Sequence, residues 1–126
     1  MIINLTAVIA GSTAAHANAI RDVIACSYIT TCDQNGACAD ASGQVTFERE
    51  PVDVQRHGEG TYRLKYDSQT VDMVLADPYA SMRWTDAEGN LNSLAGTGQS
   101  TMLWLQTTVG DVPTSEAHFL TCEGNS

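Results

Sequence analysis

The chain has 126 residues, of which 15 are Asp or Glu and 6 are Lys or Arg, and its formal net charge is −9. This length supports one domain with a modest hydrophobic core. A field of this sign repels phosphate groups, so the charge argues against nucleic acid and anionic membrane surfaces as partners. A basic protein or a small ligand is the partner expected, unless the acidity serves only solubility.

The chain opens with an apolar stretch, Met1–Ala10, and then reaches the small-residue site Ala15-His16-Ala17. This arrangement is typical of an export signal with its cleavage point. We therefore predict a signal peptide over 1–17, a single domain over 18–126, and a periplasmic or secreted protein. An N-terminal element of a cytosolic protein is the alternative, because no basic residue precedes Arg21. The stretch is too short to span a bilayer and no second apolar run follows, so no membrane insertion is expected.

Beyond the leader, apolar residues alternate in short runs, and no window shows a helical period. In the clearest run, Tyr62, Leu64 and Tyr66 alternate with Arg63 and Lys65, as in a half-buried strand. In chain order, the predicted strands are 24–32, 45–49, 62–66, 71–75, 80–84, 91–94, 101–105 and 117–122.

Turn-forming residues separate these runs, and Pro51 is expected to bulge or end the second strand. Short connections between about eight strands favour an all-β fold, either a small antiparallel eight-stranded barrel or a sandwich, mostly a meander. Closure of the first strand on the last would remove exposed edges. We expect Trp84 in the core, whereas the pattern leaves Trp104 either in the core or on an outward contact surface.

Four cysteines allow three pairings. Cys32 and Cys38 flank a tight polar turn, and Cys26 and Cys122 lie in the first and last strands, which meet if a barrel closes. We therefore predict two disulfides, Cys26–Cys122 and Cys32–Cys38, which suit an oxidising compartment. A metal or redox site is the alternative, but the spacing lacks the Cys-x2-Cys pattern of such centres.

No catalytic or cofactor motif stands out. His57 and His118 have no nearby sequence partner that would suggest a metal or catalytic pair, and the serines lack the Gly-x-Ser-x-Gly elbow. The stretch from Asp33 to Asp40 lacks the glycine position and terminal Glu of a calcium loop. We therefore expect no catalytic residues, no metal and no cofactor.

A family resemblance rests on Cys26 near Tyr28, the eight-strand pattern, Gly96-Thr97-Gly98 before the strand with Trp104, and Cys122 near the C-terminus. Together these features resemble the bacterial C-type lysozyme inhibitor family. The resemblance implies a small exported β-barrel with a loop that enters the lysozyme cleft. That family's loop carries Ser-Gly-x-x-Tyr with a basic residue nearby, whereas positions 95–100 here read Ala-Gly-Thr-Gly-Gln-Ser. The candidate contact residues are Gly96, Thr97, Gly98, Gln99, Ser100 and Trp104.

The chain also resembles uncharacterised small exported proteins with a cysteine-containing N-terminal strand and a Leu-Thr-Cys ending. The sequence thus predicts an exported, non-catalytic binding module whose ligand is unidentified. An inhibitor of a basic hydrolase such as C-type lysozyme is the alternative. A small enzyme is a third hypothesis, and it requires a pocket where His57 or His118 meets a carboxylate. An eight-stranded barrel can hold a small ligand or fill its interior with side chains, and the sequence leaves this and the oligomeric state open.

Overall fold

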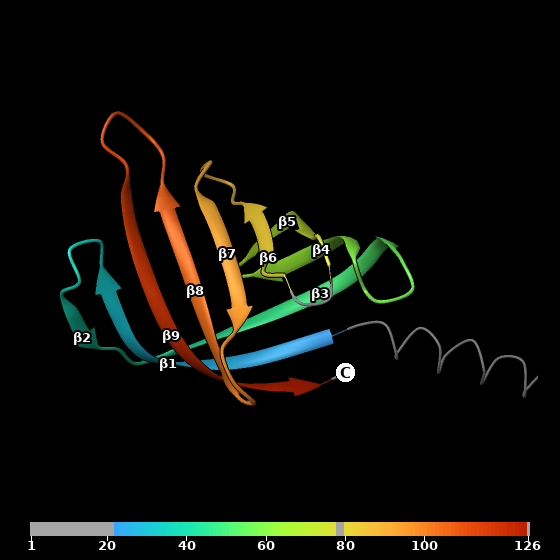
Figure 1. Cartoon of the computed structure of the whole chain (residues 1–126), viewed down its shortest axis with the longest axis horizontal. Coiled ribbons are helices and arrows are strands. Elements are labelled where there is room, and N and C mark those ends of the chain that lie inside the picture. The colour runs from blue at the N-terminus through green and yellow to red at the C-terminus, as the bar shows by residue number, and fades with distance from the viewer. Residues whose placement is uncertain (1–21, 78–79, 126) are drawn as a thin grey trace, which may run out of the picture.

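The computed structural model describes residues 22–77 and 80–125, and this part of the chain is all-β (Figure 1). The predicted leader, 1–17, lies outside the described residues. The strands are β1 (Asp22–Asp33), β2 (Cys38–Asp40), β3 (Gln44–Val54), β4 (Gly60–Tyr66), β5 (Gln69–Leu75), β6 (Met82–Thr85), β7 (Leu91–Gly96), β8 (Thr101–Thr108) and β9 (Thr114–Asn125).

Successive strands from β3 to β9 pair antiparallel with their neighbours, and β1 pairs with both β3 and β9. The sheet therefore closes into an eight-stranded antiparallel barrel, a meander with β2 as one additional strand. This confirms the predicted fold and selects the barrel over the sandwich. In the described part of the chain, no helix has the length and apolarity needed to cross a membrane.

Strand β1 has partners along both edges. One edge pairs with β9, from Val23 opposite Asn125 to Asp33 opposite Glu116. The other edge pairs first with β3 and then, from Thr30 to Cys32, with β2. Strands β2 and β3 therefore act as two halves of one interrupted strand, separated by 41–43. The Tyr28 N–H donates to the Gly43 carbonyl at 3.0 Å and so ties the interruption to β1.

The sequence did not predict β2, because its three residues are all exposed and show no apolar alternation. The pairing with β1 and the Cys32–Cys38 bridge hold it in the sheet. Strand β3 also runs past Pro51 to Val54, with a register shift between Pro51 and Asp53. Pro51 therefore accompanies a bulge, which is one of the two expected outcomes, and does not end the strand.

The bulge brings the backbones of β3 and β4 close together at Gly60. A Cβ on Gly60 would lie 2.1 Å from the Asp53 carbonyl oxygen, and the glycine has φ of 145°. Only glycine fits this close approach without a backbone shift. The start of β4 is therefore set by one small residue against the bulged strand.

Both predicted disulfides form, and each joins residues that lie directly opposite each other in the sheet. Cys26–Cys122 connects the first and last strands of the barrel across a sequence separation of 96 residues. Cys32–Cys38 closes the β1–β2 hairpin across a separation of 6 residues. The pair of bridges indicates an oxidising compartment.

The two disulfides should contribute unequally to stability. In the chain-entropy model, the Cys26–Cys122 loop stabilises the fold by about 4–5 kcal/mol and the short Cys32–Cys38 loop by about 2 kcal/mol. We expect the Cys26→Ala/Cys122→Ala variant to lose more free energy of unfolding than Cys32→Ala/Cys38→Ala, as measured by urea unfolding. An equal loss in both variants would show that barrel closure does not depend on the long bridge.

Candidate binding surface

The centre of the barrel is filled by four aromatic side chains, Phe47, Tyr66, Trp84 and Trp104. Each of their six pairs has ring centroids between 5.2 and 6.4 Å apart. The Trp84 Nε1–H donates to the Tyr66 hydroxyl at 2.8 Å, and burial raises the pKa of Tyr66. Trp84 is therefore in the core, as predicted.

Trp104 also belongs to this interior cluster, because only 2% of its surface is exposed. Its indole points inward, away from any outer contact surface. The inclusion of Trp104 among the partner-contact residues was therefore wrong. Strand β8 has large residues on both faces, so the sequence pattern could not show which face closes over the core.

A chain of polar groups satisfies the buried hydrogen-bonding atoms beside the aromatic cluster. The Trp104 Nε1–H donates to Asn92 Oδ1 at 3.0 Å, and Asn92 Nδ2 donates to Asp86 Oδ2 at 3.2 Å. Asp86 Oδ1 accepts the N–H groups of Glu88 and Asn90 in the β6–β7 turn. Burial alone would raise the pKa of Asp86, but these hydrogen bonds outweigh it and lower the pKa.

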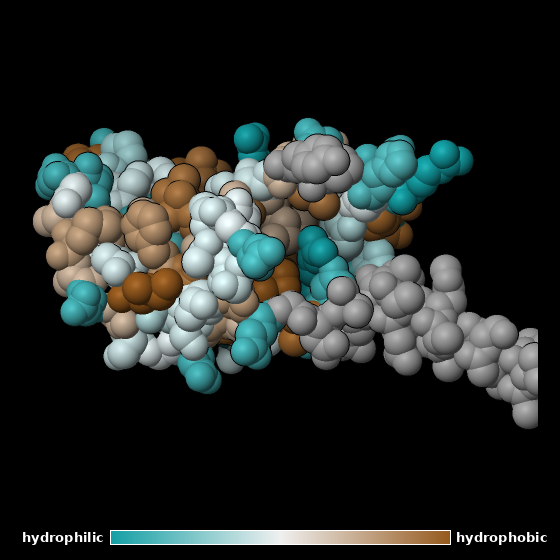
Figure 2. Space-filling model, turned by 60° about the horizontal axis from the view of Figure 1, so that its bottom comes forward, coloured by the Kyte–Doolittle hydropathy of each residue, from teal (hydrophilic) through white to brown (hydrophobic). Residues whose placement is uncertain are grey.

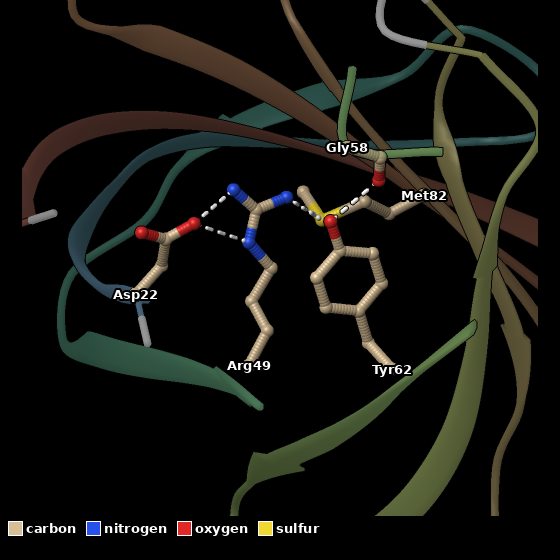
Figure 3. Close-up of polar contacts among 5 residues, drawn as sticks. All are labelled: Asp22, Arg49, Gly58, Tyr62 and Met82. Carbon is tan, nitrogen blue, oxygen red and sulfur yellow. Dashed lines mark hydrogen bonds and ion pairs between the residues drawn. The ribbon is translucent and has the colours of Figure 1, made fainter. Parts of the chain in front are cut away.

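The end of the barrel near the start of β1 is occupied by an arginine that points inward (Figure 3). The Arg49 guanidinium forms an ion pair with Asp22, its neighbour across the β1–β3 pairing. Its Nη1 lies 3.6 Å from the Met82 sulfur, and its Cζ lies 5.3 Å from the centroid of the Tyr62 ring. The Tyr62 hydroxyl in turn donates to the Gly58 carbonyl. These contacts close one end of the interior.

The interior toward the opposite end contains a half-buried histidine. His118 Nε2 lies 2.8 Å from Gln106 Oε1, and Nδ1 lies 3.0 Å from the Thr31 hydroxyl. Because a carbonyl oxygen only accepts, Nε2 carries the proton and Nδ1 accepts from Thr31. The ring also packs against Trp104 and Tyr28, at centroid distances of 5.2 and 5.5 Å.

Side chains therefore occupy the interior at its centre and toward both ends. Five large side chains are fully buried, one of them from the aromatic cluster: Phe47, Leu64, Met73, Leu94 and Leu120. No buried side-chain nitrogen or oxygen in the described residues lacks a hydrogen-bond partner. Of the two interiors left open by the sequence, the structure has the filled one.

A groove of about 860 Å³ lies in the barrel wall, and we call it the wall groove. It forms because β6 is short. Only Met73–Leu75 of β5 pair with β6, so Gln69–Asp72 have no strand partner on that side within the described residues. The Ala87 N–H donates to Gln69 Oε1 at 3.1 Å and closes the far end of this gap. The lining residues are Arg63, Thr70, Val71, Asp72, Val74, Arg83, Trp84, Thr85, Asp86, Ala87, Leu91, Asn92, Ser93, Leu105 and Thr107.

The wall groove combines exposed apolar and cationic side chains. Val74, Leu91 and Leu105 are 49%, 51% and 43% exposed. The Arg63 side chain makes no hydrogen bond or ion pair within the described residues, and Arg83 Nε has only a 3.4 Å contact with the Ser81 hydroxyl. The sequence does not predict this site, because its residues come from five strands and the β6–β7 turn and none forms a local motif.

The loop proposed from the family resemblance, Gly96–Ser100, is exposed between β7 and β8 (Figure 1). The Ser100 carbonyl accepts the Cys122 N–H at 2.7 Å, which ties the loop to β9. The loop does not line the wall groove. The structure therefore separates two candidate contact regions, the loop and the groove.

Charge is distributed unevenly over the barrel. In the described part of the chain, Lys and Arg occur only between Arg49 and Arg83, so β7, β8, β9, β1 and β2 carry none. Exposed apolar side chains include Ile29, Leu105 and Phe119 on these strands. Figure 2 shows one face of the molecule, where brown and pale residues lie side by side over much of the surface and teal hydrophilic residues lie among them and toward the upper corners. The loop 96–100 thus projects from a part of the barrel that has acidic but no basic residues.

The two described histidines lie outside both regions. The His57 N–H donates to Glu59 Oε1 in the β3–β4 turn, and His118 lies within the barrel. Asp33 begins the stretch that faintly resembles a calcium loop. Its side chain accepts hydrogen bonds from the N–H groups of Asn35 and Ala37 and so shapes the β1–β2 turn. Within 22–77 and 80–125, no three His, Cys, Asp or Glu side chains gather in a group suited to a metal ion.

Comparison with protein-family models, curated proteins and solved structures found no match for this chain. The function must therefore be argued from its own geometry.

His118 should make stability depend on pH in the weakly acidic range. Burial lowers its pKa below the ordinary value of 6.5, an effect that the nearby Glu116 partly opposes. Below pH 6.5 the unfolded chain takes up the proton before the folded chain does, so the free energy of unfolding falls as the pH drops toward the folded pKa. We expect His118→Gln to remove this component from urea unfolding between pH 7.5 and 5.

The matched control is His57→Gln, which changes the exposed histidine of the β3–β4 turn and should leave the pH dependence intact. The same slope in the His118→Gln variant as in the parent chain would contradict the role of His118.

Proposed function

We propose that this protein is an exported, non-catalytic binding module that recognises its partner on the outside of the barrel wall. The observation that carries the proposal is the filled interior, together with a groove of about 860 Å³ on the outer wall. This volume is in the range of ligand sites in proteins, about 300–1,000 Å³. The wall groove also has the apolar surface and the few polar groups that such sites contain.

Export is supported by two independent features. Both disulfides join opposed strand residues and leave no free cysteine among the described residues. The sequence before the barrel contains the apolar stretch and the Ala15-His16-Ala17 site. The proposed compartment is the periplasm or the extracellular space, where such bridges persist.

The absence of catalysis is proposed from the surroundings of the titratable groups. The third hypothesis required a histidine and a carboxylate in one pocket, but neither His57 nor His118 lines the wall groove. The groove carboxylate with a shifted pKa, Asp86, uses its oxygens to hold the β6–β7 turn and Asn92. These contacts support a structural role for Asp86.

The test distinguishes a barrel whose interior is filled by side chains from one whose interior binds a ligand. The chain is expressed with residues 1–17 in place, and its mass should show cleavage after Ala17 and both disulfides. Because the barrel is packed, we expect no saturable fluorescence increase when this protein is titrated with the uncharged apolar probe N-phenyl-1-naphthylamine, which the guanidinium groups of the wall groove do not attract. A Phe47→Ala variant empties space at the centre and should bind this probe. Recognition at the wall would be refuted if the parent chain bound one equivalent of the probe, an apolar ligand displaced it, and a larger side chain introduced in the interior abolished the binding.

A second candidate is inhibition of a basic hydrolase such as C-type lysozyme. The specific observation in its favour is the exposed loop 96–100 on the side of the barrel that lacks Lys and Arg. A basic enzyme could approach this side without meeting a like charge, and opposite fields speed association. The loop is also held to β9 through Ser100, so it need not be ordered on binding.

The second candidate is tested by lysozyme activity with micromolar protein at low and high ionic strength. Inhibition should weaken at high salt, because the Debye length falls from about 10 Å at 0.1 M to about 3 Å at 1 M. A Gly96→Trp variant should abolish inhibition by blocking the loop. Gly110→Trp is the matched control at the opposite end of β8, since an added Cβ meets no atom within 4 Å at either glycine. Full lysozyme activity with the parent chain would eliminate this candidate.

A further inference from the structure

The wall groove exposes a stretch of strand edge that lacks a partner. Strand β5 pairs with β4 along its whole length, but on its other side the pairing with β6 begins only at Met73. Backbone groups of alternate residues in Thr70–Asp72 therefore point into the groove without a ladder partner on that side. Such an edge can accept an extended chain through main-chain hydrogen bonds.

The length of this edge limits what can bind there. The gap is closed at one end by the Ala87–Gln69 hydrogen bond and at the other by the pairing of Met73 with Trp84. Thr70–Asp72 lie between these limits, so the free edge accommodates a short extended segment and not a long strand.

The outward side chains around this edge indicate the side chains of the partner. Arg63 lies opposite Asp72 across the β4–β5 pairing, and Arg83 lies opposite Val74 across β5–β6. Leu91 and Leu105 follow on β7 and β8. Side chains on one face of an extended segment recur every two residues, about 6.6–6.8 Å apart. One such side chain can therefore lie near the guanidinium groups while the next lies over the apolar residues.

The charges of the wall groove favour an acidic side chain. Asp86 uses both oxygens in hydrogen bonds beneath the groove. Among the acidic residues that line the groove, only Asp72 is then available to pair with Arg63 and Arg83. Two guanidinium groups against one carboxylate leave hydrogen-bonding capacity for a second carboxylate.

We propose that the wall groove binds a short extended peptide segment that carries an acidic side chain and, two residues away, an apolar one. This proposal rests on recognition at the barrel wall and specifies the chemistry of the partner there. The main chain of the segment pairs with Thr70–Asp72, its carboxylate lies at Arg63 and Arg83, and its apolar side chain covers Val74 and Leu105.

The test titrates the ¹⁵N-labelled mature chain with the blocked peptide acetyl-Thr-Glu-Thr-Leu-Thr-amide and follows amide chemical shifts. We expect saturable shifts at Thr70–Asp72 and at Arg83. The same peptide with Lys in place of Glu, and one with an N-methylated backbone, should each bind at least about fivefold more weakly. Decanoate tests whether a simple amphiphilic carboxylate suffices.

The variants separate charge recognition from folding. Arg63→Gln and Arg83→Gln should each lower the affinity for the Glu peptide by about fivefold or more, whereas Asp72→Asn should raise this affinity. Arg56→Gln, in the β3–β4 turn and outside the groove, is the matched control and should leave the affinity unchanged. Thermal unfolding confirms that each variant is folded.

Each of the following outcomes would overturn the proposal: no shifts at millimolar peptide, equal binding of the Lys or N-methylated peptide, decanoate binding at least as well as the peptide, or tighter binding after Arg83→Gln. Shifts confined to 96–100 would also overturn it but would leave recognition at the wall standing. Shifts confined to interior residues that do not line the groove, such as Phe47 and Leu94, would overturn both.

Discussion

The pairing of β1 with β9 is the constraint on which the rest of the structure depends. It joins the two ends of the described chain along almost all of β1, from Val23 to Asp33. Cys26–Cys122 cross-links directly opposed residues within this pairing, so the sheet cannot open at its first and last strands without breaking a covalent bond. Closure removes the edges that an open meander would expose. The same bridge lies in the core, where Cys26 and Cys122 are 3% and 9% exposed.

Closure also determines what can occupy the interior. The inward side chains of eight strands meet on one axis, and in this chain several of them are large and aromatic. Phe47, Tyr66, Trp84 and Trp104 contact one another, and the indole N–H groups find acceptors in Tyr66 and Asn92. An aromatic interior with satisfied polar atoms is stable without a ligand. The proposed recognition is therefore assigned to the outer wall and the loops.

The barrel wall is incomplete beside β6, because this strand is short. A strand of four residues cannot cover the neighbouring seven-residue β5, and the chain turns away at Asp86 to form the buried network with Asn92. One local feature thus has two consequences: it anchors the polar side of the core and leaves part of β5 without a partner. The exposed Arg63 and Arg83 lie beside that opening, in a protein whose net charge is −9.

The sequence alone predicted the all-β class, the number of barrel strands, the meander order and both disulfides. These features depend on local alternation, turn residues and cysteine position, which can be read without knowing which residues meet in space. The alternation in 62–66 placed Tyr62, Leu64 and Tyr66 inside, where they are 6%, 0% and 5% exposed. Only the tertiary structure decided the rest. Trp104 lies on a strand with large residues on both faces, so its direction depends on how β8 packs against β7 and β9. Strand β2 forms because it pairs with β1, and the wall groove forms because β6 is shorter than β5. Both features depend on pairing between strands, which no local sequence pattern encodes.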